Sequence, residues 1–247
     1  MTLIASHRGG ALQWPENSPT AFRNTVALPV DQVEFDIHPT ADGEIVVIHD
    51  ATLDRTTDGS GPVASRSLAE LRRITLNGTA GEHMLTLAEL AELFAPTSIT
   101  LRMEVKPDAE HRPYPGLLAR ALAVLDRAGL RGRTVVTSFQ AETAAEAART
   151  AGLAGAIWLV SPQVQDDIGL SCVAAVTAAH GLRHVGIRQN RLDAETLATL
   201  RAAGLGVGAW AVNDEATIRR VLGLGVDVFT TDMPTRALEL RRAVTPV

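Results

Sequence analysis

Short runs of Val, Ile and Leu alternate along the chain with longer stretches that are rich in Ala, Leu and Arg. The short runs have the length of buried strands, and the longer stretches repeat apolar residues with a helical period. Eight strands are expected, at residues 3–6, 32–37, 99–105, 134–138, 155–159, 184–187, 206–212 and 227–230. This alternation predicts repeated βα units and a parallel sheet.

Helices are expected between these runs, and several of their ends carry local signals. The expected helices cover residues 20–28, 115–128, 141–150, 171–180, 194–203, 215–222 and 235–243. Ser18 before Pro19 is typical of an N-cap with proline at the first helical position. Gly129 and Gly152 each follow a helical stretch, where a left-handed residue would end the helix.

Eight βα units in 247 residues have the size of a closed (β/α)8 barrel, the TIM barrel. An open doubly wound sheet is the alternative. Such a sheet normally carries a glycine-rich phosphate turn after its first strand, and residues 6–10 read SHRGG rather than G-x-G-x-x-G. We therefore predict an α/β protein whose residues 1–247 form one barrel domain.

The alternation is interrupted after the second strand. Residues 44–49 have the pattern of an extra strand, and residues 56–62 are dense in turn formers. Two short helices are expected at residues 68–73 and 87–94. We predict a small insertion between strands 2 and 3, over approximately residues 44–96, that is too short to bury a good core of its own. It would lie at the C-terminal rim of the barrel, where catalytic residues gather.

Composition excludes several classes of protein. With 46% hydrophobic and 21% charged residues the chain can bury a core, and its 23 basic residues are scattered, so we expect no nucleic-acid partner. The single cysteine, Cys172, excludes an internal disulfide, and its Ala/Val-rich surroundings predict a buried thiol. No apolar run reaches about 18 residues, so we expect no membrane insertion and a cytoplasmic location. The oligomeric state stays open.

Carboxylates alternate with apolar residues on two neighbouring strands. In residues 33–37, Glu34 and Asp36 share one face and three apolar residues share the other. In residues 101–106, Glu104 likewise lies opposite the apolar face. Because the apolar faces must meet the helices, the three acids are expected to point into the barrel.

Three carboxylates withdrawn from water repel one another and need compensation. A divalent cation would supply it, and ligands that are all oxygen favour Mg²⁺, Ca²⁺ or Mn²⁺ over zinc. The alternative is a structural ion-pair network with Arg8, Arg102 and Lys106. From the two strands alone, both interpretations are equally supported.

Two histidines are expected at the same rim. His7 ends the first strand, and His49 precedes Asp50 at the end of the extra strand. Imidazole titrates at about pH 6.5, so one ring can act as a base and the other as an acid. Arg8 and Lys106 add cations suited to a phosphate. Together these groups indicate phosphodiester cleavage.

These residues belong to an ordered series of short motifs. In order, the motifs are His7-Arg8-Gly9-Gly10, Pro15-Glu16-Asn17-Ser18, Glu34-Phe35-Asp36, Asp42-Gly43 with Val46-Val47-Ile48-His49-Asp50, residues 53–61, Leu85-Thr86-Leu87, Met103-Glu104-Val105-Lys106-Pro107, Ser138-Phe139, Trp210-Ala211-Val212-Asn213 and Thr231-Asp232-Met233-Pro234. In this order and at these intervals, the chain resembles the glycerophosphodiester phosphodiesterase family over nearly its whole length.

The resemblance implies a (β/α)8 barrel with a small insertion that hydrolyses glycerophosphodiesters to sn-glycerol 3-phosphate and an alcohol. It implies a divalent cation held by Glu34, Asp36 and Glu104, with His7 and His49 as the acid–base pair. The implied substrate-binding residues are Arg8, Lys106, Glu16, Asn17, Phe139 and Trp210.

Departures from the family pattern are mild. Ser18 stands where threonine is usual, and Ala211 stands where threonine more often precedes Val-Asn. Both bear on substrate fit rather than on the type of reaction. We expect His7 to act as the base and His49 as the acid, and either water or a glycerol hydroxyl can be the nucleophile.

Two other functions are weighed. The sphingomyelinase D-type phospholipases share the barrel, the paired histidines and the acidic ligands, but they carry disulfide cysteines that this chain lacks. A phosphate- or metal-binding barrel without turnover is the second alternative. The pair His7 and His49 argues against it, because binding alone needs no titrating groups.

The other histidines are expected to have structural roles, and His38 is expected in the loop after the second strand.

Overall fold

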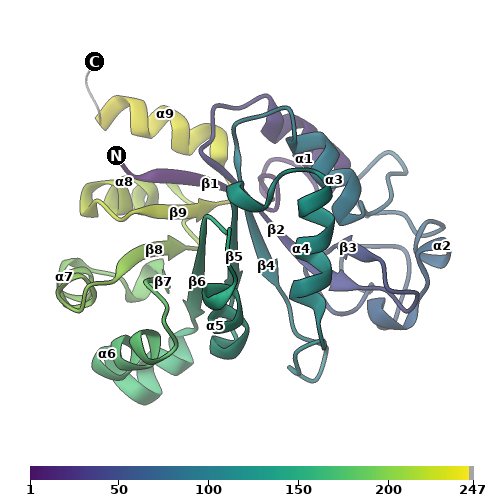
Figure 1. Cartoon of the computed structure of the whole chain (residues 1–247). Helices are drawn as coiled ribbons and strands as arrows, with labels where there is room; N and C mark the ends of the chain where they lie inside the picture. Colours follow the sequence, from purple (N-terminus) through teal and green to yellow (C-terminus); the bar gives the residue numbers. More distant parts are fainter. Residues whose placement is uncertain (245–247) are drawn as a thin grey trace.

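The computed structural model describes residues 1–244, which form a closed barrel of eight parallel strands surrounded by helices (Figure 1). The order around the barrel is β1-β2-β4-β5-β6-β7-β8-β9, and parallel pairing of β1 with both β2 and β9 closes it. The barrel strands are β1 (Leu3–His7), β2 (Gln32–Pro39), β4 (Thr100–Val105), β5 (Thr134–Ser138), β6 (Gly155–Val160), β7 (His184–Arg188), β8 (Gly206–Trp210) and β9 (Val228–Thr231). The predicted TIM barrel is confirmed, and the open sheet is excluded.

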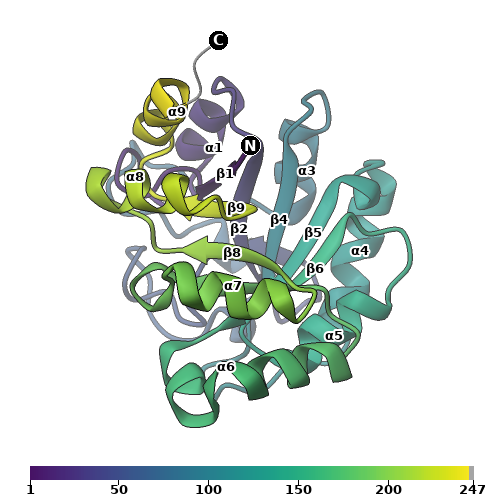
Figure 2. The same ribbon diagram turned by 90° about the vertical axis from the view of Figure 1, so that its left-hand side faces the viewer.

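Helices cover the outside of the barrel, and Figure 2 shows α6 and α7 running along one flank. They are α1 (Pro19–Val26), α3 (Leu87–Phe94), α4 (Leu117–Arg127), α5 (Ala141–Arg149), α6 (Pro162–Ala179), α7 (Ala194–Ala202), α8 (Glu215–Leu224) and α9 (Pro234–Val244). Ser18 caps α1 by accepting the Ala21 N–H at 3.0 Å, as the Ser-Pro signal predicts. None of these helices combines the length and apolar character needed to cross a bilayer.

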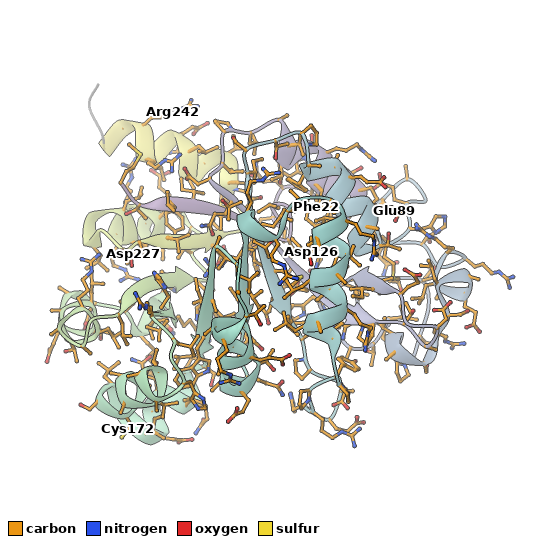
Figure 3. The ribbon with its side chains drawn as sticks, viewed as in Figure 1. Phe22, Glu89, Asp126, Cys172, Asp227 and Arg242 are labelled. Carbon is orange, nitrogen blue, oxygen red and sulfur yellow. The ribbon has the colours of Figure 1, made fainter. Side chains whose placement is uncertain are left out.

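The main core lies between the outward faces of the strands and the helices. Phe22 of α1 packs edge to face against Phe35 of β2 and Phe94 of α3, with ring centroids 6.4 and 6.0 Å apart. Phe22 is labelled among these elements in Figure 3. Because successive strand residues face opposite sides, burying Phe35 on the helices turns its neighbours Glu34 and Asp36 into the barrel.

The connection between β2 and β4 forms a layer at the C-terminal ends of the strands, on the side to which the arrows point in Figure 1. It contains β3 (Ile45–Val47), which pairs antiparallel with the end of β2, and α2 (Leu68–Leu71). Contrary to expectation, this layer buries a small core of its own, made of Val46, Ile48, Leu53, Val63, Leu71, Leu76 and Met84. The helix α3 packs in the main core, so it is a barrel helix and not part of the insertion.

Predictions about α6, Cys172 and the end of β8 are also wrong. Helix α6 begins at Pro162 instead of residue 171, because Ser161 caps it, and Gly169 then breaks its regular backbone with a φ of 73°. Cys172 on α6 is exposed rather than buried, as its position at the outer edge of Figure 3 shows. Strand β8 ends at Trp210, because Ala211 adopts a left-handed backbone with a φ of 61°.

Candidate active site

A cavity of about 230 Å³ lies at the C-terminal ends of the barrel strands. Seven of the predicted site residues line it: His7, Arg8, Glu34, His49, Glu104, Phe139 and Trp210. The other four contact these residues or one another within the same cluster: Asp36, Lys106, Glu16 and Asn17. The fold therefore brings all of the predicted residues to one place.

The three predicted metal ligands converge inside the barrel. One carboxylate oxygen each from Glu34, Asp36 and Glu104 lies within 4.8 Å of the other two. The register of the sheet causes this convergence, since Asp36 of β2 is paired directly with Glu104 of β4. All three residues are buried.

Cations compensate part of this negative charge. Lys106 Nζ lies 2.7 Å from Glu104 Oε1 and 3.3 Å from Asp36 Oδ1, and Arg8 Nε lies 3.3 Å from Asp36 Oδ2. Asn17 also donates its amide N–H to Asp36 at 2.9 Å. Burial alone would raise the pKa of Asp36, but Lys106 and Arg8 outweigh it and hold the pKa well below its usual value. These cations therefore keep Asp36 ionised, although its Oδ1 accepts no hydrogen bond within residues 1–244.

Glu34 differs from Asp36 because no lysine or arginine side chain forms an ion pair with it among the described residues. Its Oε2 accepts the backbone N–H of Arg8 at 3.2 Å, while its Oε1 is buried and has no hydrogen-bond partner among the described residues. Burial, followed by the charge of Asp36, raises the pKa of Glu34 to about 8. The third cation of the ion-pair interpretation, Arg102, instead donates to Gln32 at 3.3 Å. An unpartnered buried oxygen beside two other carboxylates fits a hard divalent cation.

His7 is held by a pair of residues from the end of the chain. Its Nδ1 lies 2.5 Å from Asp232 Oδ1, and Asp232 accepts the side-chain N–H of Asn213 at 2.5 Å while donating its own N–H to Asn213 at 2.8 Å. The other ring nitrogen, Nε2, lies 3.8 Å from Glu34. Burial would lower the pKa of His7, but Glu34 and Asp232 together raise it.

His49 is held by residues of the insertion. Its Nδ1 lies 2.5 Å from Asp50, and Arg55 donates to Asp50 at 2.7 Å. Arg55 also donates two hydrogen bonds of 2.8 Å to Glu16, which accepts a further one from Arg8 at 3.0 Å. The hydrogen bond from Arg55, assisted by His49, lowers the pKa of Asp50 well below its usual value. This chain of contacts ties the insertion to the loop after β1.

His38 belongs to β2 and not to a loop, so its predicted place is wrong. The strand continues through Pro39 because β3 pairs with its end. His38 is fully enclosed: its Nε2 donates to the His49 carbonyl at 3.1 Å, and its Nδ1 accepts from the Tyr114 hydroxyl at 3.2 Å. Burial lowers the pKa of His38 to about 4, so a neutral ring supports the backbone of His49.

The far wall of the cavity is apolar. Phe139 and Trp210 meet edge to face with centroids 5.4 Å apart, and Leu159 lies beside them. Trp210 donates its indole N–H to the Gly186 carbonyl at 3.2 Å. The cavity therefore joins a charged side on β1, β2 and β4 to an apolar side on β5, β6 and β8.

Comparisons with known proteins agree with this geometry. A sequence model of the glycerophosphoryl diester phosphodiesterase family matches residues 7–236. A glycerophosphodiester phosphodiesterase of Caldanaerobacter subterraneus is 28% identical over 98% of both chains. The solved structure of a candidate glycerophosphoryl diester phosphodiesterase from Agrobacterium tumefaciens is 40% identical, covers 99% of this chain and 98% of its own, and superposes with a TM-score of 0.97. A second such structure, from Silicibacter pomeroyi, is 28% identical, covers 99% and 94%, and has a TM-score of 0.88. This chain therefore belongs to the glycerophosphoryl diester phosphodiesterase family.

Proposed function

We propose that this protein hydrolyses glycerophosphodiesters to sn-glycerol 3-phosphate and an alcohol, with a divalent cation held by Glu34, Asp36 and Glu104. One observation carries the proposal: a buried triad of carboxylates, with an oxygen of Glu34 that has no hydrogen-bond partner among the described residues, occurs together with two histidines that line the same cavity. The family match supports the same substrate class.

The cation would be Mg²⁺, Ca²⁺ or Mn²⁺, because the ligands are all carboxylates. When bound, it supplies electrostatic stabilisation of the negative charge that develops on the phosphate oxygens. Arg8 and Lys106 would add donors to the same phosphate. Both side chains already lie beside Asp36, so little rearrangement would be needed.

The two histidines would move the protons. Each ring has its Nδ1 beside a carboxylate, which fixes the tautomer with the proton on Nδ1 and leaves Nε2 free for the cavity. One ring would take the proton of the attacking hydroxyl, and the other would protonate the departing alcohol, which would otherwise leave as an unstable alkoxide. We retain His7 as the base and His49 as the acid.

The direct test follows sn-glycerol 3-phosphate released from glycerophosphoglycerol by the purified protein. Turnover should stop with a chelator and return with Mg²⁺, Ca²⁺ or Mn²⁺. Glu34→Gln should lower kcat at least about a hundredfold, as expected when a charged ligand is lost. Glu44→Gln, at an exposed position, is the matched control and should keep full activity.

Each alternative function has its own outcome in this experiment. Unchanged turnover in excess chelator would reject the metal-dependent proposal. Tight binding of the diester without any product would favour a barrel that only binds. Cleavage of sphingomyelin with release of choline, and no reaction of glycerophosphoglycerol, would favour the phospholipase alternative. A small-molecule substrate and a cytoplasmic location stay predictions from the sequence.

A further inference from the structure

The inward-facing residues of the barrel divide into two chemical groups. On β2 and β4 they are the charged residues described above. On the opposite arc Val135, Ile157 and Leu159 cluster with Trp210, Gly186 has no side chain, and Thr137 adds one neutral hydroxyl to the cavity lining. A Cβ at Gly186 would lie 2.6 Å from Leu159 and 3.6 Å from Trp210, so glycine is what allows this wall to form.

Arg188 adds a charged side chain at the C-terminal end of this arc. On β7, Val185 and Ile187 face the main core, so strand alternation turns Arg188 to the inner side at the C-terminal end. It is paired in register with Trp210 of β8. Counting along the closed barrel, β7 is the fourth strand from β2 in either direction. Arg188 therefore lies across the barrel mouth from the carboxylate triad.

Within the described part of the chain, the guanidinium of Arg188 has no partner of opposite charge. Its Cζ lies 5.6 Å from the centroid of the Trp210 ring, and within residues 1–244 its side chain makes no ion pair and no hydrogen bond. Two acids that follow on the same arc are engaged elsewhere, since Asp166 pairs with Arg191 at 2.6 Å and Asp214 accepts from Thr217 at 2.6 Å. Among residues 1–244, this arc thus presents a largely apolar wall with the unpaired cation Arg188 at its rim.

We propose that this wall receives the departing alcohol and that Arg188 selects alcohols that carry a negative charge, such as a phosphate monoester or a carboxylate. A guanidinium fork matches both anions. Choline or ethanolamine would meet a like charge at a ring that Arg188 already covers. This inference rests on the proposed function and adds to it the substrate class.

The test compares kcat/KM for three diesters: glycerophosphoinositol 4-phosphate, glycerophosphoinositol and glycerophosphocholine. The wild type should prefer the phosphorylated diester over the unphosphorylated one by about tenfold or more, which is the value of one charge-assisted hydrogen bond. Glycerophosphocholine should be the poorest of the three substrates. Arg188→Gln should bring the ratio of kcat/KM for the phosphorylated and unphosphorylated inositol diesters close to one. Arg188→Glu should make the unphosphorylated diester the better of the two. Arg191→Gln, at a neighbouring exposed arginine that pairs with Asp166, should keep the wild-type ratio.

Arg188 is exposed and makes no side-chain hydrogen bond within the described residues, so its variants should unfold at the wild-type temperature. The inference is overturned if Arg188→Gln leaves the ratio unchanged, or if the choline diester is the best substrate of the wild type. Equal release of sn-glycerol 3-phosphate from all three diesters would reject this inference alone. No release from any of them would reject the proposed function, and this inference with it.

Discussion

The two histidines at the cavity are held by different parts of the molecule. His7 and Asp232 are 225 residues apart and meet because β1 and β9 close the barrel, and Asn213 fixes Asp232 on both sides. His49 and Asp50 are neighbours in the sequence and lie in the insertion. The difference suggests that one proton-transfer group belongs to the rigid barrel and the other to a layer that packs on a smaller core.

The carboxylate partners of the two histidines also differ in their exposure to solvent. Asp232 is 14% exposed and is held by partly buried hydrogen bonds, whereas Asp50 is 26% exposed and depends on Arg55, which is 48% exposed. Hydrogen bonds at exposed positions contribute less, because water competes for the same groups. We therefore expect substitution of Asp232, the partner of His7, to lower kcat more than substitution of Asp50, the partner of His49.

The largest effect is expected from the histidines. His7→Ala and His49→Ala should each lower kcat by about 10²–10⁴ with little change in folding. A diester with a 4-nitrophenyl leaving group needs no protonation as it departs. If His49 is the acid, His49→Ala should be nearly as active as the wild type on this substrate, while His7→Ala stays slow. The reverse pattern would exchange the two roles, and full activity of both variants would reject the pair.

The next effect is expected at Asp232. Asp232→Asn removes the charge that orients His7, and kcat should fall about 10–100-fold with little change in KM, as is usual for a group that holds a functional histidine. The pH dependence of kcat should also shift, because Asp232 contributes to the raised pKa of His7. Loss of that contribution lowers the pKa of His7, so the limb due to this ring should move to lower pH. A fall in stability with an unchanged pH profile would show a purely structural role.

A smaller effect is expected at Asp50. Asp50→Asn should lower kcat only about three- to tenfold, since the neutral ring of His38 also holds the backbone of His49. Measuring this variant beside Asp232→Asn under the same conditions compares the two pairs directly. An equal or larger loss at Asp50 would contradict the view that the barrel holds its histidine more firmly.

The smallest effect is expected at Arg55, which joins the insertion to Glu16. Arg55→Gln should change kcat/KM by about two- to fivefold, because exposed ion pairs contribute little, and the change should shrink at high salt. Arg73→Gln, at an exposed position of the insertion, is the control. A loss as large as that of Asp232→Asn would mean that the insertion, and not the barrel, sets the geometry of the site.

Much of the fold could be predicted because strand and helix periods are local. The boundaries of β5 and the N-cap of α1 follow from a few neighbouring residues. The start of α6 was missed although Ser161-Pro162 repeats the Ser18-Pro19 signal. The exposure of Cys172 depends on how its helix is rotated against the barrel, which composition does not determine.

The site is predictable where strand alternation determines it. Glu34 and Asp36 had to share a face, and parallel register then brings Glu104 beside them. The partners of the histidines needed the tertiary structure. Asp232 was beside the last strand, and barrel closure was the signal that could have placed it next to His7. The ion pair of Arg55 with Glu16 joins residues 39 positions apart, and no neighbouring sequence signal predicts it.

The central claim is that three carboxylates converge on one divalent cation between two histidines. The most direct measurement is the anomalous difference density of a crystal soaked in Mn²⁺. The account predicts one strong peak among the carboxylate oxygens of Glu34, Asp36 and Glu104, and its absence from Glu34→Gln crystals. A wild-type crystal without that peak, in which Arg8 and Lys106 remain the only cations beside Asp36, would contradict it.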